Sequence, residues 1–244
     1  MSEWLAGKNP VMEALKSGRP LEKLFIADGV KASNTVHLMQ LAKERGIVVQ
    51  RVKRQKLDQL TGGSAHQGIV ATVAAYHYRE LSDVIAASQS SDEAPFLIVL
   101  DGVEDPHNLG AIIRTADAAG ANGVIIPKRR AVGLTATVAK ASAGAIEYVP
   151  VVRVTNLTRT LQQLKQQGFW VTGAEAEADQ AYTEVDFTEP TAIVIGSEGK
   201  GISRLVRETC DYLVHLPMHG KVNSLNASVA AALLMYEVRR KRNV

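Results

Sequence analysis

Short apolar runs alternate with helix-like segments from residue 95 to the end of this 244-residue chain, and this alternation restricts its fold more than any other feature. The apolar runs are residues 96–101, 123–127, 148–152, 169–174, 191–197 and 212–216. Helical periodicity occupies residues 109–120, 135–144, 155–168 and 222–240. Strands that alternate with helices form a mostly parallel sheet with both faces covered. We therefore expect an α/β domain over residues 95–244.

The front of the chain shows a smaller version of the same pattern. Helical periodicity appears at residues 9–18 and 35–46, and strand-like runs at 21–28, 46–52 and 68–75. Residues 76–94 lose this pattern, and their last residues include Ser, Asp and Glu before Pro95, which is typical of a linker with a short helix. The sequence thus predicts a small α/β domain at 1–75, a linker at 76–94 and the larger domain at 95–244.

Composition excludes several classes of protein. No apolar run reaches about 18 residues, so no membrane partner is expected. The first residues lack a basic start followed by an apolar stretch, and so do not resemble a secretory signal. Cys210 is the single cysteine, which excludes an internal disulfide, suits a reducing cytoplasm and is interpreted as a core residue. A cytoplasmic location is expected.

Positive charge is unevenly distributed. Residues 1–75 carry 11 Lys/Arg and 6 Asp/Glu, a net of +5, so the remainder of this +3 chain carries −2. One basic cluster follows a strand-like run, and a second closes the chain. The clusters are Arg51, Lys53, Arg54 and Lys56, and Arg239, Arg240, Lys241 and Arg242. Each cluster can bind phosphates or form an ordinary solvated surface, and charge alone leaves both interpretations open.

Residues 100–120 combine a strand end, a turn and a helix. Asn108 is placed where an N-cap residue belongs, and Gly120 is placed just past the helix end. Arg114 is the only basic residue of this helix, and Asp117 follows it at i+3. The two can form a surface ion pair. Alternatively, the Arg114 guanidinium faces a cleft and binds a phosphate.

A glycine-rich turn follows the run 191–197 and reads GSEGKG. Its spacing fails the Walker motif, and Arg204 stands where a dinucleotide fingerprint needs glycine. Glu198 would repel a phosphate. The segment is therefore either an ordinary tight turn or a site for a neutral or cationic ligand that approaches bare backbone.

A third polar segment, KVNSLNASVA, precedes the long C-terminal helix. Capping explains one or two of its polar residues but not all four, which are Asn223, Ser224, Asn226 and Ser228. His215 and His219 are four residues apart, but Pro217 lies between them and no Cys or carboxylate is in register. No metal site is expected.

Together these segments, DPHNLGAIIRTADAAG, IGSEGKGIS and LPMHGKVNSLNASVAAALLMYE, resemble the signature motifs of the SpoU branch of the SPOUT RNA methyltransferases, the TrmH/RlmB family. The resemblance covers residues 96–240 in order. Residues GKNPVMEAL through HQGIVATV resemble that family's small L30e-like substrate-binding domain. Length and layout are most similar to the RlmB-type members, which methylate a guanosine ribose 2′-hydroxyl of 23S rRNA.

The resemblance implies a parallel SPOUT sheet whose C-terminal segment forms a trefoil knot. It implies S-adenosylmethionine as cofactor, held in a bent shape largely by backbone groups. It also implies a homodimer formed through the knot region and the last helix. By position, the expected cofactor-binding residues are Gly196, Gly201, Leu216, Met218 and Leu225.

The same resemblance assigns the catalytic role to Arg114, accompanied by Asn108, Glu198, Ser224 and Asn226. A guanidinium almost never loses its proton. We therefore favour Arg114 as a phosphate clamp and stabiliser of the developing alkoxide over a role as base, which stays open.

RNA, with no DNA, is the expected partner, and Arg51, Lys53, Arg54 and Lys56 are the expected RNA-binding residues. A fragment cut near residue 90 should keep the cofactor site and lose most RNA affinity. Methylation of tRNA, methylation of an rRNA site that gives antibiotic resistance, and RNA binding without catalysis are the alternatives.

Overall fold

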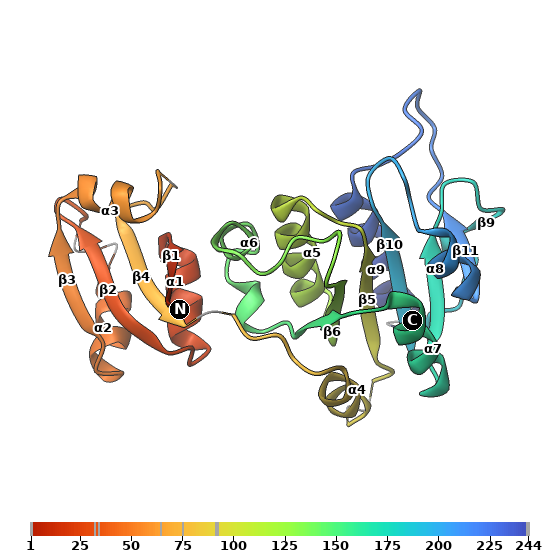
Figure 1. Cartoon of the computed structure of the whole chain (residues 1–244), viewed down its shortest axis with the longest axis horizontal. Helices are drawn as coiled ribbons and strands as arrows, with labels where there is room; N and C mark the ends of the chain where they lie inside the picture. Colours follow the sequence, from red (N-terminus) through yellow and green to blue (C-terminus); the bar gives the residue numbers. More distant parts are fainter. Residues whose placement is uncertain are drawn as a thin grey trace. The chain divides into compact units, whose positions relative to one another are not determined.

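The computed structural model describes residues 2–31, 33, 35–63, 65–74, 76–90 and 93–242. The chain divides into two compact units (Figure 1). Unit 1 contains residues 1–77 together with 134–148, and unit 2 contains residues 78–133 and 149–244. Within the described residues, no helix has the length and apolar character that crossing a membrane requires.

Unit 1 is built on a four-stranded sheet in the order β1-β4-β2-β3. β4 is antiparallel to both of its neighbours, whereas β2 and β3 are parallel. The strands are β1 (Ser2–Ala6), β2 (Leu21–Ala27), β3 (Val48–Val52) and β4 (Ile69–Ala74). The helices are α1 (Lys8–Lys16), α2 (Val36–Glu44) and α3 (Arg54–Leu60). β1 and α3 were not expected, because neither segment has a clear apolar period.

The segment 134–148 leaves the large sheet after β6 and joins unit 1. It contains α6 (Ala136–Ala141), which packs against β1, and the 3₁₀ helix η2 (Ala145–Glu147), which packs against α1. Glu147 accepts from the Arg19 guanidinium at 2.9 Å, and both side chains are buried. The Arg19 guanidinium also stacks on the Tyr76 ring, 3.4 Å from its centroid. This segment is therefore part of the core of unit 1.

Unit 2 is built on a seven-stranded parallel sheet in the order β7-β6-β5-β10-β8-β11-β9. The strands are β5 (Phe96–Asp101), β6 (Gly123–Pro127), β7 (Val151–Val154), β8 (Trp170–Ala174), β9 (Gln180–Ala181), β10 (Thr191–Gly196) and β11 (Tyr212–His215). The expected α/β class and parallel sheet are confirmed. The strand order does not test the trefoil knot, which stays a prediction.

Helices cover both faces of this sheet, as its fully apolar central strands require. The helices are α4 (Leu81–Gln89), α5 (Pro106–Ala118), α7 (Leu157–Gln166), α8 (Arg204–Thr209) and α9 (Ala227–Arg242), with the 3₁₀ helix η3 (Tyr182–Glu184). α4, α7 and α8 share one core cluster with Leu97 and Val99 of β5. Side chains alternate along a strand. The buried Ile98 and Leu100 therefore face the other side, where α5 packs on α9.

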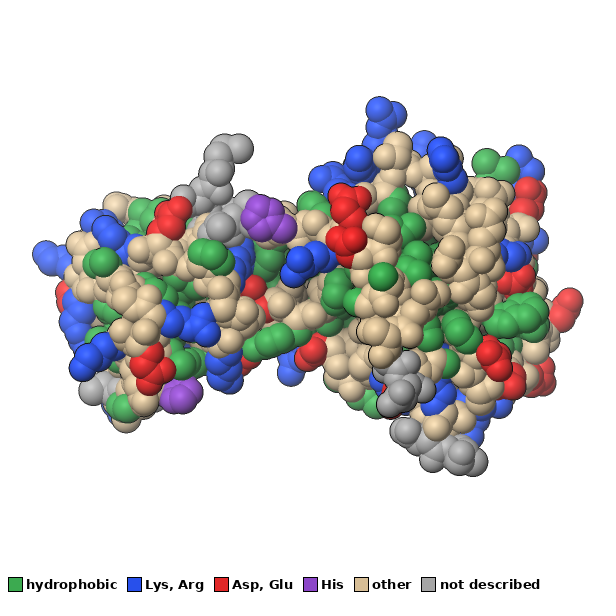
Figure 2. All heavy atoms as spheres, turned by 90° about the horizontal axis from the view of Figure 1, so that it is seen from below, with side chains coloured by type: hydrophobic (Ala, Val, Ile, Leu, Met, Phe, Trp, Pro, Cys, Tyr) green, Lys and Arg blue, Asp and Glu red, His purple; other side chains and the backbone are tan. Residues whose placement is uncertain are grey.

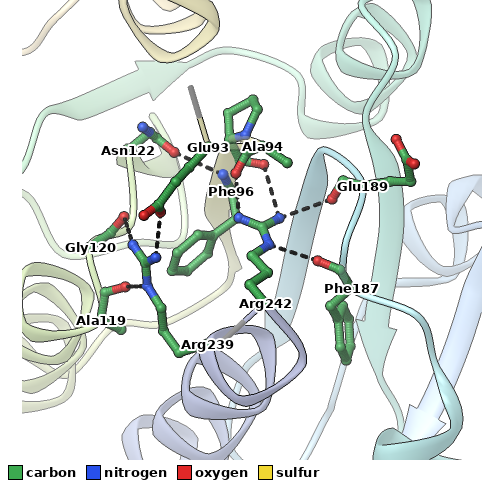
Figure 3. Close-up of polar contacts among 11 residues, drawn as sticks. Glu93, Ala94, Phe96, Ala119, Gly120, Asn122, Phe187, Glu189, Arg239 and Arg242 are labelled. Atoms are coloured by element: carbon green, nitrogen blue, oxygen red, sulfur yellow. Dashed lines mark hydrogen bonds and ion pairs between the residues drawn. The ribbon is translucent and has the colours of Figure 1, made fainter. Parts of the chain in front are cut away.

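Two of the four basic residues that end helix α9, Arg239 and Arg242, donate hydrogen bonds to backbone carbonyls of unit 2 (Figure 3). Arg242 donates to the carbonyls of Ala94 and Pro95 before β5 and to those of Phe187 and Glu189 before β10. Arg239 donates to the carbonyls of Ala119 and Gly120 at the end of α5 and pairs with Glu93. Both guanidiniums lie about 5.5 Å or less from the Phe96 ring centroid. The expectation of a surface cluster at 239–242 is thus wrong for these two residues.

Candidate active site

A cavity of about 460 Å³ opens at the carboxyl ends of β5 and β10. The strand order changes direction at this point, because β6, the next strand in the chain, lies on one side of β5 and β10 lies on the other. Such switch points are where open α/β sheets bind ligands. The lining residues are Asp101, Gly102, Val103, Glu104, Asp105, Asn108, Arg130, Ser197, Glu198, Lys200, Gly201, Ser203 and Ala227.

Helix α5 begins at this cavity, but Asn108 is not its N-cap. Asp105 caps the helix, since its carboxylate accepts from the amide of His107 at 2.8 Å, and Pro106 occupies the first helical position. An N-cap followed by proline is a strong start signal. Asn108 therefore lies in the first turn, is only 7% exposed, and has its side-chain amide free for other partners.

Asn108, Glu198 and Asn226 form one hydrogen-bonded network, although they come from three distant segments. Glu198 Oε1 accepts from Asn108 Nδ2 at 2.8 Å and from Asn226 Nδ2 at 2.7 Å. Asn108 Oδ1 also accepts from Asn226 Nδ2, at 3.0 Å. The network therefore joins the start of α5, the turn after β10 and the start of α9.

The orientation of the network follows from one backbone group. Asn226 Oδ1 accepts from the Ser228 amide at 2.9 Å and from its hydroxyl at 2.6 Å, which caps α9. Since Oδ1 is used in this way, Nδ2 must face Glu198. Because Asn226 Nδ2 also donates to Asn108, Asn108 must accept this bond with Oδ1. Its Nδ2 then donates to Glu198. Each of the three side chains makes at least two hydrogen bonds, which restrains the network.

The turn at 197–201 is closed by its own backbone. Ser197 and Gly201 exchange two hydrogen bonds, of 3.1 and 3.0 Å. Gly196 packs so closely on this turn that a Cβ would lie 2.1 Å from the Gly201 carbonyl carbon. In addition, Asp101 accepts from the amide of Ser203 at 2.7 Å. These contacts fix the position of Glu198 relative to β5.

The other residues expected at the site lie elsewhere. Arg114 is exposed on α5, about one and two-thirds turns beyond Asn108, and does not line the cavity. Ser224, Met218 and Leu225 are exposed in the loop 216–226, which extends beyond the sheet edge after β11 (Figure 1). Leu216, at the start of this loop, is half-buried. Their roles stay predictions.

The basic cluster of unit 1 lies on one edge of its sheet. β3 is an edge strand and carries Arg51, and Lys53, Arg54 and Lys56 follow at the start of α3. All four side chains are exposed. Figure 2 shows Lys and Arg side chains spread over the visible face of unit 1. This arrangement is compatible with an RNA surface, and that assignment also stays a prediction.

Two cavity residues, Arg130 and Lys200, were not singled out by sequence reasoning. The signal for Arg130 is the basic run Lys128–Arg130 placed directly after a strand. Cys210 behaves as the expected core residue, because its thiol donates to the Val206 carbonyl and burial raises its pKa to about 12. His215 lies at the end of β11, and no group of metal-binding side chains occurs in the described part of the chain.

Comparison with known families covers both parts of the chain. Residues 95–236 match the SpoU rRNA Methylase family. Residues 4–79 match the domain described as RNA 2′-O ribose methyltransferase substrate binding.

Similar proteins span nearly the whole chain. A Bacillus subtilis protein named for the TrmH family of tRNA/rRNA methyltransferases, YacO, is 58% identical over 99% of this chain and 96% of its own length. A Staphylococcus saprophyticus protein named for the same family is 52% identical over 98% of this chain and 96% of its own.

Two solved structures share the fold. The SpoU methyltransferase AviRb from Streptomyces viridochromogenes, in complex with AdoMet, superposes with a TM-score of 0.83 at 26% identity, covering 99% of this chain and 91% of AviRb. The AdoMet-bound rRNA methyltransferase from Sinorhizobium meliloti gives a TM-score of 0.82 at 25% identity, over 98% of this chain and 87% of the other.

Proposed function

The chain belongs to the SpoU rRNA Methylase family, and we propose that this RNA methyltransferase transfers the methyl group of S-adenosylmethionine to a guanosine ribose 2′-hydroxyl of 23S rRNA. The network of Asn108, Glu198 and Asn226 carries the proposal. It unites three motifs at a cavity over the switch point of the sheet, and an RNA-binding protein without catalytic activity has no need of it.

The backbone around the sheet edge fits S-adenosylmethionine. Gly196 ends β10 and Leu216 follows β11, so both lie at the carboxyl ends of the strands, on either side of β8. Residues 216–225 make no backbone–backbone hydrogen bond with any described residue, so their N–H and C=O groups are open to a ligand. Gly196, Gly201, Leu216, Met218 and Leu225 would hold the cofactor. When bound, it supplies a methyl group that its sulfonium already activates, so we expect transfer without a metal.

The residues of the cavity would position the ribose. Asn108 and Asn226 can each donate and accept, which suits a sugar that carries hydroxyl groups. Glu198 orients both amides and places a negative charge near the cavity. The 2′-hydroxyl must share or lose its proton during transfer. A guanidinium such as Arg114 would stabilise the developing alkoxide and bind the adjacent phosphate.

A homodimer would complete this site. Val229, Leu233 and Tyr236 form an exposed apolar face along α9, at helical spacing. Arg114 lies away from the cavity of its own chain, so we propose that it serves the site of a second copy. We propose further that residues 1–75 bind the RNA, with Arg51, Lys53, Arg54 and Lys56 on its phosphates.

Mapping of 2′-O-methyl groups in rRNA and tRNA from cells with and without the gene tests the reaction. One 23S rRNA guanosine should lose its methyl group. Loss in tRNA alone would support the tRNA alternative, and no change in either would contradict the proposal. Calorimetry with a chelator present should still show S-adenosylmethionine binding.

Mixed dimers test the role of Arg114. Arg114→Ala and Asn226→Ala should each abolish transfer, with cofactor affinity retained in the first. Mixing the two variants should restore activity if Arg114 acts across the dimer, since one of the two sites is then complete. No recovery would place Arg114 in its own chain's site. Arg114→Lys should rescue little, because an ammonium lacks the planar fork.

A further inference from the structure

The loop after β6 carries three consecutive cations beside the candidate site. β6 pairs with β5 in parallel, so its carboxyl end emerges next to the turn that leads to Asn108. Lys128, Arg129 and Arg130 follow directly, and all three side chains are exposed. None of these side chains makes a hydrogen bond or ion pair with a residue in the described ranges. Arg130 lines the cavity.

The backbone holds Arg130 in an unusual conformation. Its φ of 56° lies in the left-handed region that side chains with a Cβ disfavour. The loop is fixed on both sides, because the Lys128 amide donates to Val154 at 2.8 Å and the Val132 amide donates to Val103 at 3.2 Å. The Arg153 guanidinium also donates to the Lys128 carbonyl at 3.1 Å. Conformations of this kind gather at functional sites.

Side chains of both charges line the cavity. Asp101, Asp105 and Glu198 are among them, and each already accepts a hydrogen bond from the chain. These carboxylates suit a neutral ribose and disfavour phosphate in their immediate vicinity. Arg130 lines the same cavity, as Lys200 does, and Arg129 precedes it in the chain. Arg130 suits the phosphate next to that ribose, since arginine binds phosphate through two parallel N–H groups.

We propose that Arg130, assisted by Arg129, binds the RNA phosphate adjacent to the target nucleotide and so places its ribose against the Asn108–Glu198–Asn226 network. The inference rests on the proposed function and adds a phosphate-binding residue to it.

Filter binding of 23S rRNA from cells lacking the gene, over a series of KCl concentrations, tests this role. Arg130→Gln should bind roughly tenfold more weakly. For Arg130→Gln, the slope of log RNA affinity against log salt concentration should be shallower by the contribution of about one neutralised phosphate. S-adenosylmethionine affinity should stay unchanged. Lys165→Gln is the matched control, because it removes one charge from the last turn of α7, where Lys165 pairs with Asp211.

Arg130→Gly separates binding from folding. It removes the side chain and also relieves the left-handed strain, so its melting temperature should equal or exceed that of the wild type while RNA affinity falls as in Arg130→Gln. Once the target is mapped, a methylphosphonate at the adjacent phosphate should weaken wild-type binding and leave Arg130→Gln unaffected.

The outcomes distinguish this inference from the proposed function. If the wild type neither binds nor methylates RNA, the proposed function fails. If it does both, and Arg130→Gln matches it in affinity and salt slope, only the phosphate contact is overturned. Glu104 lines the same cavity as Arg130. If Arg130→Gln and Glu104→Gln lower the melting temperature equally and the salt slope is unchanged, Arg130 pairs with Glu104 and does not bind RNA phosphate.

Discussion

Asn226 contributes to the candidate site through both atoms of its side-chain amide. The oxygen caps α9, and this fixes the nitrogen toward Glu198 and Asn108. Aspartate at this position would keep the cap, but it would place a second carboxylate oxygen against Glu198. The position therefore requires an amide, for a reason that capping preference alone does not give.

Gly196 offers a residue-scale prediction. In Gly196→Ala, the added Cβ would meet only backbone atoms of Gly201 and Ile202, so no side chain can move aside and the turn must open. The free energy of unfolding should fall by about 1–3 kcal/mol. S-adenosylmethionine affinity, measured by calorimetry, should be largely lost.

Gly199→Ala is the control in the same turn. Its φ of 80° makes alanine strained, but a Cβ there would meet nothing within 4 Å. This variant should lose stability while keeping cofactor affinity. Equal affinities in the two variants would mean that the closed turn does not shape the cofactor site.

Sequence reasoning selected Asn108, Glu198 and Asn226 as candidates but could not place them in contact. Glu198 and Asn226 follow Asn108 by 90 and 118 residues, and only the folding of the sheet brings the three segments together. The N-cap assignment of Asn108 was wrong, because Asp105 with Pro106 forms the better helix start. Arg130 was missed, because the residues that line the cavity with it, such as Asn108 and Glu198, are distant in sequence.

Helix α9 runs along the large sheet from the carboxyl ends of its strands to their amino ends. Its 16 residues span about 24 Å, slightly more than the length of a six-residue strand. Asn226 begins it at the cavity, and Arg242 ends it at the carbonyls that precede β5 and β10. Anchoring at the far end therefore helps to hold the network at the near end.

Arg242→Ala should lower the free energy of unfolding by about 2–3 kcal/mol, since several carbonyls lose a charged donor. Cofactor affinity should fall with it, because α9 carries Asn226. Arg204→Ala is the control, because Arg204 pairs with Glu208 at 2.7 Å and both side chains are exposed, so the urea midpoint of this variant should barely move. Matching midpoints for the two variants would contradict an anchoring role for Arg242.

At the element scale, the long apolar runs were predictable and the short elements were not. The runs at 96–101, 123–127 and 191–197 became β5, β6 and β10, because buried parallel strands must be apolar throughout. β7 begins only at Val151, since the preceding residues form η2 and Pro150 interrupts the run. α8 and β9 are too short to leave a period in the sequence.

At the scale of the molecule, the chain passes between units three times. Nothing in the sequence indicates that residues 134–148 group with residues 1–77, because a helical period shows which face is buried but not against what. Val138, Ala139, Ala145 and Ile146 are buried in unit 1, and Glu147 meets Arg19 there. Removal of the first 77 residues would therefore leave an apolar segment of unit 1 without its partner.

Two fragments test this consequence. Residues 78–244 with the native 134–148 segment should form species larger than a dimer in size-exclusion chromatography and bind a hydrophobic dye, because α6 and η2 lose their packing surface. The same fragment with a Gly/Ser linker of equal length in place of 134–148 should elute as the proposed dimer, should not bind the dye and should still bind S-adenosylmethionine. Both should bind RNA more weakly, with a shallower salt dependence than the full chain. If the native-segment fragment behaves like the linker fragment, burial of 134–148 does not depend on residues 1–77. If RNA affinity and salt slope equal those of the full chain, the basic edge of unit 1 is an ordinary solvated surface.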